Sequence, residues 1–472
     1  MYSIANVLIP IITTPYLART LGADAIGTNS YVAANVSYFL LFAVLGTTIY
    51  GQRQIATVKD DAYQLSVSFK EIIIFRLVTT FCSFVGFLVL LQFRIEYKKL
   101  YFIYILSFLN VIVDISWFYK GIENFKKVTL RSFFVRFLHT VFIFAFINQP
   151  EDLWLYVLSS ACCTILGNGS MWIGLKGRLV KTSQVHPFKN TKHILLLFFP
   201  TIASQVYILL DRSMMGWING STYQIGCYEE AEKLIRIAIS IIESTSMVML
   251  SRIAFLYKED KRADAIAYVY KAYRFAIMLA LPMVFGLLAI INRLVPIFWG
   301  VGFDYVFKVM PILCIMLPIT SISSVTGYSL LIPIGKQNVY TIAISCTAVT
   351  NIFLNIFFIS FMGGVGAAIA SVLSEIVGMS IQLIWCNKKQ LIRISKIFAY
   401  SWKYLLASVI MYVLIKLCFA NLDNNVVSLL FLIALGTVVY SLLLFIFHDT
   451  FFRSNVKSFV FSIRERFAKN SG

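Results

Sequence analysis

Charged side chains inside long apolar runs are the residues of this sequence whose types could do chemistry. The run 194–218, ILLLFFPTIASQVYILLDRSMMGWI, holds one adjacent pair of charges, Asp211 and Arg212. A run of this length crosses a bilayer, where an acid and a base are costly unless they face protein or water. The pair therefore indicates a polar path through the membrane.

Four more ionisable residues fall in the half of their apolar runs that we assign to the cytoplasmic side. At about 1.5 Å of rise per residue, Arg76 and Arg136 lie roughly 10 Å from the cytoplasmic ends of their helices. Asp114 lies in the same half, so these three residues are expected to form one cluster of two cations and an anion. His139 follows Arg136 by three residues and shares its helix face.

The remaining charges lie deeper or toward the outer end: Glu243 and Glu375 near the midplane, and Arg19 with the Asp211–Arg212 pair near the outside. An arginine fork binds phosphate through two parallel hydrogen bonds, so the arginines predict an anionic substrate. The carboxylates and the histidine predict ion coupling. Snorkelling or structural ion pairing is the alternative, and it weighs equally for arginines near helix ends and for Glu375. The other carboxylates are too short to snorkel far.

The composition identifies the elements that must position these charges. Of 472 residues, 59% are hydrophobic and 13% are charged, against about 25% charged in soluble domains. We expect an all-α polytopic membrane protein with about fourteen transmembrane helices. The predicted spans are 3–20, 28–50, 69–91, 101–119, 130–147, 153–175, 194–218, 235–256, 270–291, 309–334, 338–361, 365–386, 399–420 and 425–448. Gly335-Lys336-Gln337 alone separates spans ten and eleven, which predicts a tight helical hairpin, and Pro282 with the prolines of span ten predicts bent helices.

Most of the 41 Lys and Arg residues fall in the even-numbered connections and the C-terminal tail. The positive-inside rule then places those connections and both termini in the cytoplasm. We expect a multi-pass protein of a bacterial cytoplasmic membrane, and the scattered basic residues that give the net charge of +19 do not indicate nucleic-acid binding.

A weak internal repeat suggests two halves. Ile26-Gly27 follows the first proline-bearing span, and Ile225-Gly226 follows the seventh, about 200 residues later. Parallel repeats of this kind place a transport site between the halves. The predicted division is an N-terminal lobe of six helices over 1–180, a C-terminal lobe of six helices over 181–390, and two extra helices with a basic cytoplasmic tail over 391–472.

Catalytic and cofactor motifs are not found in the sequence. Gly335-Lys336 has Gln337 where a phosphate loop needs Ser or Thr, and Leu330 where it needs its first Gly, so ATP hydrolysis on this chain is not expected. The cysteines form no C-x-x-C pair and the histidines no cluster, which predicts no metal site. We predict a protein that is not an enzyme and has no cofactor, with H⁺ or Na⁺ as the candidate coupling ion.

Five stretches together resemble oligosaccharide flippases of the O-antigen, capsule and teichoic-acid export type, which belong to the multidrug/oligosaccharidyl-lipid/polysaccharide exporter superfamily. The stretches are 8–56 (LIPIITTPYLARTLGADAIGTNSYVAANVSYFLLFAVLGTTIYGQRQIA), 114–118 (DISWF) with the Asp211-Arg212 region, 331–337 (LIPIGKQ) and 363–371 (GGVGAAIAS). One departure is that no Lys or Arg precedes Arg19, whereas family members usually begin with a short basic segment.

The resemblance implies two six-helix bundles around a central cavity. It also implies movement of an undecaprenyl-diphosphate-linked oligosaccharide from the cytoplasmic to the outer leaflet by alternating access, with a membrane lipid environment and with polysaccharide polymerase and glycosyltransferases as partners. The predicted substrate-binding residues are Arg19, Arg53, Arg76, Arg136 and Arg212. The predicted ion-coupling or cavity residues are Asp114, Asp211, Glu243, His139 and Glu375. Of these, Arg19, Arg53, Asp114, Asp211 and Arg212 lie in the matching stretches.

Two alternatives stay open. A drug or cation antiporter of the same superfamily would share the architecture and line its cavity with carboxylates, whereas arginine in the apolar runs favours an anionic substrate. A membrane polysaccharide polymerase is a weaker alternative, because such enzymes need a sizeable external loop or a catalytic His/Asp arrangement, and the sequence offers neither.

Overall fold

The computed structural model describes residues 2–93, 96–175, 177–182, 184–418 and 423–454, with the backbone alone at 2–8, 197, 199–201, 203–204, 245 and 248. Within these ranges every regular element is a helix. The prediction of an all-α polytopic protein is confirmed. The basic tail expected at the C-terminus lies outside the described residues from 455 onward.

The chain forms two compact units. Unit 1 comprises residues 1–230, 299–305 and 348–370, and unit 2 comprises 231–298, 306–347 and 371–472. Three helices contribute residues to both units: α9 (Thr222–Lys258), α13 (Gln337–Met362) and α14 (Gly364–Lys388). The lobe boundaries expected near 180 and 390 stay a prediction.

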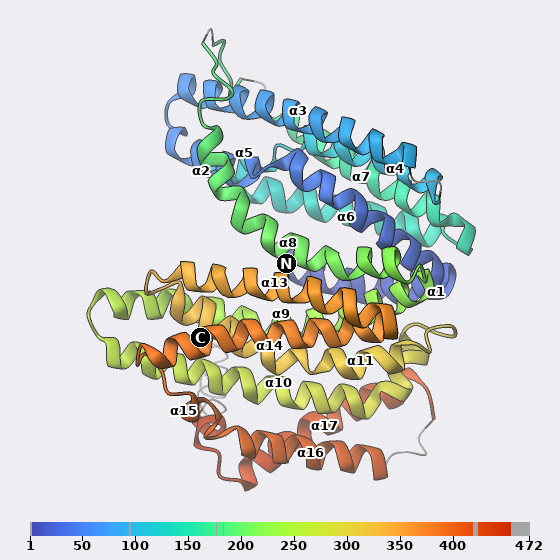
Figure 1. The fold of residues 1–472 in the computed structure, drawn as a ribbon, viewed down its shortest axis with the longest axis vertical. Coiled ribbons are helices and arrows are strands. Elements are labelled where there is room, and N and C mark those ends of the chain that lie inside the picture. Colours follow the sequence, from blue (N-terminus) through green and yellow to red (C-terminus); the bar gives the residue numbers. More distant parts are fainter. Residues whose placement is uncertain (1, 94–95, 176, 183, 419–422, 455–472) are drawn as a thin grey trace, which may run out of the picture. The chain divides into compact units, whose positions relative to one another are not determined.

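Unit 1 contains the helices that precede α9. They are α1 (Tyr2–Val44), α2 (Thr47–Val58), α3 (Ala62–Phe93), α4 (Lys98–Val113), α5 (Ser116–Gly121), α6 (Phe125–Phe146), the 3₁₀ turn η1 (Pro150–Asp152), α7 (Leu153–Ile173) and α8 (Thr191–Ile218). Helix α4 packs against α3 and α7, and α6 packs against α7, so these four helices run side by side (Figure 1).

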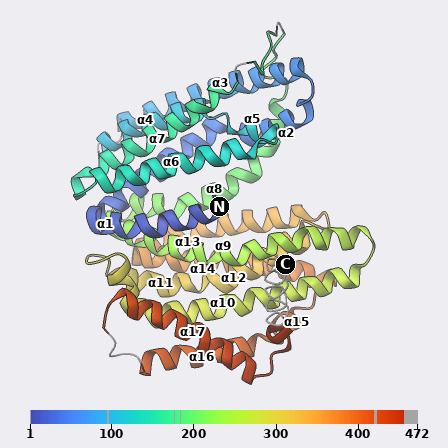
Figure 2. The same ribbon diagram turned by 180° about the vertical axis from the view of Figure 1, so that it is seen from behind.

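Unit 2 is built on α10 (Arg262–Phe298), which packs against the two last helices of the chain (Figure 2). Its other elements are α11 (Val306–Cys314), α12 (Met316–Ser324), the π-helix η2 (Val325–Leu331), α15 (Ile394–Phe398), α16 (Ser401–Cys418) and α17 (Val426–Ile446). Span ten comprises α11, α12 and η2, and Ile315 and Val325, which join these elements, keep right-handed helical φ/ψ, so the bend expected there stays a prediction. Gly335, with φ 74°, turns the chain into α13 and confirms the predicted hairpin.

Eleven helices among the described residues are long and apolar enough to cross a membrane. The first, Ile9–Val58, covers two predicted spans, and α7 and α8 overlie the spans expected at 153–175 and 194–218 without being among the eleven. The total of about fourteen stays a prediction. Span eight needs a correction, because α9 begins at Thr222 rather than near 235. The acidic sequence YEEAEK lowers the local hydropathy, yet its glutamates are buried.

Helix α1 consists of two helical segments that meet at Gly22, whose φ of 78° and ψ of 170° are not helical. Glycine adopts positive φ without the steric cost that a side chain brings. This break falls between the two predicted spans 3–20 and 28–50, and it redirects the chain before the second segment.

The two glycines of the weak sequence repeat pack against each other. A Cβ added at Gly27 would overlap the carbonyl oxygen of Thr222, and one added at Gly226 would overlap that of Ala23. Helix α1 and the start of α9 therefore approach at backbone distance, the kind of crossing that small residues permit in membranes. The Thr222 hydroxyl also donates to Asp24 Oδ1 at 3.0 Å.

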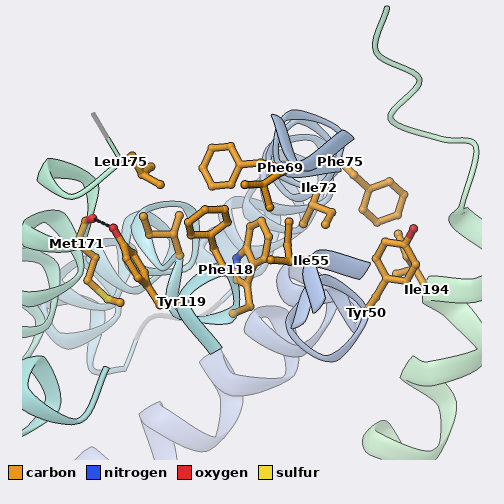
Figure 3. Close-up of a cluster of buried hydrophobic side chains, with 13 residues drawn as sticks. Tyr50, Ile55, Phe69, Ile72, Phe75, Phe118, Tyr119, Met171, Leu175 and Ile194 are labelled. Carbon is orange, nitrogen blue, oxygen red and sulfur yellow. Dashed lines mark hydrogen bonds between the residues drawn. The ribbon is translucent and has the colours of Figure 1, made fainter. Parts of the chain in front are cut away.

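An aromatic core closes one end of unit 1 (Figure 3). Trp117 and Phe118 from α5 pack on Phe69 of α3, with Phe69–Trp117 ring centroids 5.6 Å apart. Tyr119 donates a hydrogen bond to the Met171 carbonyl at 2.6 Å and so joins α5 to α7. The core fixes the short helix α5, and with it the break between α4 and α5.

The α1–α9 crossing leads to a stability prediction. Gly27→Ala and Gly226→Ala each lower the free energy of unfolding by about 1–3 kcal/mol, because the new methyl group meets backbone atoms that cannot move independently. Thermal unfolding of the purified protein in detergent measures the change. Gly169→Ala in α7 is the matched control, since its Cβ would meet nothing within 4 Å, and helix propensity makes this variant equal to or more stable than wild type. Equal melting of all three variants would contradict the tight crossing.

Candidate functional site

Arg76 is buried, with 1% of its surface exposed, and every group it contacts is uncharged. Its Nε donates to Thr47 Oγ1 at 2.9 Å and its Nη2 to Thr48 Oγ1 at 2.7 Å. Its Nη1 donates to the Asp114 carbonyl oxygen at 2.6 Å. The guanidinium thus joins the start of α2 to the carboxyl end of α4, where helix carbonyls lack intrahelical partners and favour a cation.

Asp114 ends α4 and begins the turn into α5. Its Oδ1 accepts from the Ser116 backbone N–H at 2.9 Å. Its backbone carbonyl also accepts from Trp117 Nε1 at 3.2 Å. Arg76 and Asp114 therefore meet as predicted, but through the backbone carbonyl and not through an ion pair. The expected three-residue cluster is wrong for Arg136, which lines a separate pocket on α6.

Asp211, 5% exposed, lies in a cluster of neutral polar groups within unit 1. Its Oδ2 accepts from the Tyr228 hydroxyl at 2.6 Å, and its Oδ1 accepts from the Asn355 amide at 2.7 Å and the Asn351 amide at 3.3 Å. Asn355 Nδ2 also lies 3.0 Å from Asn351 Oδ1, and Asn355 Oδ1 is buried with no hydrogen-bond partner among the described residues. We call these four residues the carboxylate–amide cluster. The cluster places the Tyr228 hydroxyl and the amide groups of Asn351 and Asn355 around the buried Asp211 carboxylate.

Arg212, the neighbour of Asp211, points to a different partner. Its Nε lies 2.5 Å from Glu229 Oε2, and Glu229 also accepts from the Ser30 hydroxyl at 2.9 Å. The Arg212 side chain is 18% exposed, although its Nε and the Glu229 side chain are buried. It joins α8 to α9 and α1 next to the glycine crossing.

The other predicted residues are distributed over both units. In unit 1, Arg53 is exposed on α2, and Arg19 is exposed beside Gly300, whose added Cβ would lie 3.1 Å from Arg19 Cγ. In unit 2, Glu243 is half-buried and accepts from the Ser324 hydroxyl at 2.6 Å, while Glu375 is half-buried on α14.

His139 and Arg136 share the pocket between α6 and α7 in unit 1. The His139 ring lies 5.5 Å from that of Tyr156. No structural observation assigns substrate or ion binding to any of the ten predicted residues, and those roles stay predictions.

Sequence reasoning missed the polar partners because it followed charge alone. Asn351 and Asn355 are one helical turn apart inside an apolar run, a spacing that places both amides on one face. Glu229 was assigned to a loop because the hydropathy of its segment is low. A search for paired amides in apolar runs would have found the first two residues.

The chain was compared with known proteins. The family described as "Polysaccharide biosynthesis protein" matches residues 1–254. The "Putative O-antigen transporter" of Escherichia coli (strain K12) is 23% identical over 411 residues, which cover 82% of this chain and 95% of that protein.

Two solved structures have a similar fold. The lipid II flippase MurJ in an inward closed conformation aligns with a TM-score of 0.73 and 20% identity, covering 96% of this chain and 99% of that one. An inward-facing multidrug resistance MATE family transporter of the MOP superfamily aligns with a TM-score of 0.61 and 16% identity, covering 81% and 97%. The resemblance seen in the sequence is confirmed. The related proteins are transporters and flippases, in agreement with the prediction that the chain is not an enzyme.

The Arg76 contacts predict a structural rather than a binding role. Arg76→Gln lowers the free energy of unfolding by about 3–5 kcal/mol, because its buried hydrogen-bond partners lose their donor. The melting temperature in detergent, measured without substrate, reports the loss. Arg53→Gln, at an exposed arginine on neighbouring α2, changes it little. An Arg76→Gln variant that melts like wild type but does not transport would instead indicate a substrate contact.

Proposed function

Because this chain belongs to the polysaccharide biosynthesis protein family, we propose that it moves a lipid-linked oligosaccharide across the membrane, with undecaprenyl diphosphate as the lipid carrier. The family match over residues 1–254 is the observation that carries the proposal. The names of the two similar proteins, a putative O-antigen transporter and a lipid II flippase, support it. The proposed direction is from the cytoplasmic to the outer leaflet by alternating access.

The proposed location is the bacterial cytoplasmic membrane, with both termini in the cytoplasm. The distribution of Lys and Arg over the connections supports this orientation. The polymerase and the glycosyltransferases that make and use such a substrate are the proposed partners.

We assign substrate contact first to Arg212, because its side chain is partly open and its guanidinium can exchange Glu229 for a phosphate oxygen. An arginine fork matches the geometry of a diphosphate, and its bond to a carboxylate is of the same kind. In this proposal Glu229 holds the guanidinium in place when substrate is absent, at 2.5 Å.

The carboxylate–amide cluster is the proposed site of the coupling ion. Na⁺, like other hard cations, prefers oxygen ligands. The Asp211 carboxylate, the Tyr228 hydroxyl and the buried Asn355 Oδ1 lie together in unit 1. H⁺ is the other candidate, since protonated Asp211 would donate to the unused Asn355 oxygen. Either ion would neutralise a carboxylate whose charge is costly when buried.

A cation antiporter is the second candidate, and the buried charges favour it. The carboxylates of Asp211, Glu229, Glu230, Glu232 and Asp449 are buried, whereas Arg76 is the one buried arginine of the described residues. Among the buried charged residues, carboxylates therefore outnumber arginines, contrary to the expectation that arginines in the apolar runs indicate an anionic substrate. The family match outweighs this count, because one or two carboxylates suffice for ion coupling in a flippase.

Complementation tests the flippase proposal. In a strain that lacks its oligosaccharide flippase, wild type restores surface polysaccharide, whereas Asp211→Asn and Arg212→Gln reduce it at least about tenfold if each loses about 1.4 kcal/mol of coupling or binding free energy. Exposed Asp423→Asn is the charge-matched control. Membrane levels are matched by immunoblot.

The contrary outcomes are distinct. Wild type that fails in strains with several different repeat units, yet lowers drug susceptibility, would favour the antiporter. Variants that match wild type would leave the family function standing and remove both residues from the site. The double variant Arg212→Gln/Glu229→Gln separates lost binding from an unpaired buried charge, because it removes both partners together.

Ion coupling gives an independent prediction. Replacing KCl by NaCl at constant ionic strength raises the melting temperature of wild type, because a ligand at 100 times its Kd stabilises the folded state by about 2.7 kcal/mol. Asp211→Asn abolishes the rise and Asp423→Asn retains it. If NaCl has no effect on wild type, but Asp211→Asn changes the pH dependence of transport, H⁺ is the coupling ion. Absence of both effects would contradict the assignment of this cluster.

A further inference from the structure

A polar pocket of about 260 Å³ lies between α6 and α7 in unit 1. Arg131, Arg136 and His139 line it from α6, and Ser160 and Thr164 line it from α7. Its lining is cationic and hydroxylic, and it shares no residue with the carboxylate–amide cluster.

The charge of this pocket is not balanced by either helix that forms it. The sequences of α6 and α7 contain no Asp or Glu. Lys127, also on α6, is already engaged, with its ammonium 2.9 Å from the Tyr119 hydroxyl and 3.4 Å from the Met171 carbonyl oxygen. The guanidiniums of Arg131 and Arg136 have no hydrogen-bond or ion-pair partner among the residues that the structure describes.

Two nitrogen atoms in the pocket are enclosed as well as unpaired, the Arg131 Nε donor and His139 Nε2, which donates or accepts according to its tautomer. Arg131 Nε and His139 Nε2 are buried without a hydrogen-bond partner in the described part of the chain. A buried donor that has no hydrogen-bond partner destabilises the folded state. Gly167 brings the α7 backbone close, since an added Cβ would overlap Val135 and lie 3.3 Å from Arg131 Cδ, so the Arg131 stem is held in place. These groups can therefore bind an acceptor atom of a ligand, because no acceptor among the described residues pairs with them.

The acceptor that fits two guanidiniums is a phosphate. Each planar fork can donate two parallel hydrogen bonds to phosphate oxygens, and the Ser160 hydroxyl offers another donor. A carboxylate has two oxygens in one plane, whereas a phosphate group arranges its oxygens tetrahedrally, with two non-bridging oxygens in a diester and three in a terminal phosphate, so it can accept from two forks that approach from different directions. We therefore favour the phosphate of a larger molecule over a simple carboxylate.

The exposed side chains of α6 near Arg136 indicate the chemical nature of the rest of the phosphate-bearing ligand. Phe133, Phe134 and Phe137 are exposed at 42%, 59% and 55%, and the Phe133 and Phe137 rings are stacked with centroids 6.2 Å apart. An apolar aromatic face one position along the helix from Arg136 suits hydrocarbon chains. A soluble anion would make no use of it.

We propose that the α6–α7 pocket binds the phosphate group of a membrane amphiphile, with its hydrocarbon chains on the phenylalanine face. Bulk phospholipid and polyprenyl diphosphate share this chemistry and are the two candidate sources. For bulk phospholipid the proposal is independent of flippase activity, whereas for polyprenyl diphosphate it rests on the proposed function, in which that lipid is the carrier.

Binding to the purified full-length protein in detergent tests the pocket. The ligands are short-chain phosphatidylglycerol, farnesyl diphosphate, inorganic pyrophosphate and a short-chain diacylglycerol that lacks phosphate. Wild type binds at least one phosphate amphiphile more tightly than pyrophosphate or diacylglycerol. Arg131→Gln and Arg136→Gln weaken that binding on the order of tenfold each, as expected for loss of a charge-assisted pair. Lys126→Gln, with the same charge change at an exposed position of α6, leaves it unchanged.

The ligand that binds more tightly identifies the source, phosphatidylglycerol for bulk lipid and farnesyl diphosphate for the polyprenyl carrier. Ser160→Leu fills the pocket without altering charge and abolishes binding, which keeps the test decisive if an arginine variant fails to fold. Binding that is equal in wild type and the arginine variants would overturn the site. Pyrophosphate binding as tight as that of the amphiphiles, or no amphiphile binding at all, would overturn it too.

Discussion

A charge enclosed between helices in a membrane must find its partners inside the protein, because hydrocarbon supplies none. Arg76 meets this constraint completely, through two hydroxyls and the carbonyls at the end of α4. Its position requires α4 to stop at Asp114, which in turn allows Trp117 to enter the aromatic core. The Arg76 hydrogen bonds and the aromatic core therefore act on the same break between α4 and α5.

The same constraint is met less completely elsewhere, and those places are where ligands are expected. Asp211 accepts from neutral donors beside the Asn355 amide oxygen, which has no hydrogen-bond partner among the described residues, and Arg212, whose side chain is partly exposed, pairs with the Glu229 carboxylate. The guanidiniums of Arg131 and Arg136 have no hydrogen-bond or ion-pair partner among the described residues, and neither α6, which carries both, nor the neighbouring α7 contains an Asp or Glu. We expect that ordering the charges within the helices by how well the chain satisfies them separates structural residues from candidate binding residues better than depth in the membrane does.

The sequence was sufficient to predict the helical class, most spans, the hairpin at Gly335 and the burial of Asp211, because each depends on hydropathy or on a local turn residue. It was insufficient for the partners. Nothing in the apolar run around Asn355 shows that the amide meets a carboxylate 144 positions away, and hydropathy placed Glu229 in a loop because a glutamate lowers the average whether it is buried or exposed. Pairing is a property of three-dimensional packing, which a window along the chain does not measure.

The crossing at Gly27 and Gly226 has a consequence for how such proteins can be recombined. The two glycines belong to segments about 200 residues apart, and each leaves room for a backbone carbonyl of the other segment. In a chimaera that takes residues 1–44 from one parent and the rest from another, Gly27 and Gly226 come from different parents. A residue larger than glycine at either position is expected to lower the stability of the hybrid, because it meets a backbone carbonyl of the other segment. Exchange of specificity between relatives is thus limited by a contact that touches no substrate.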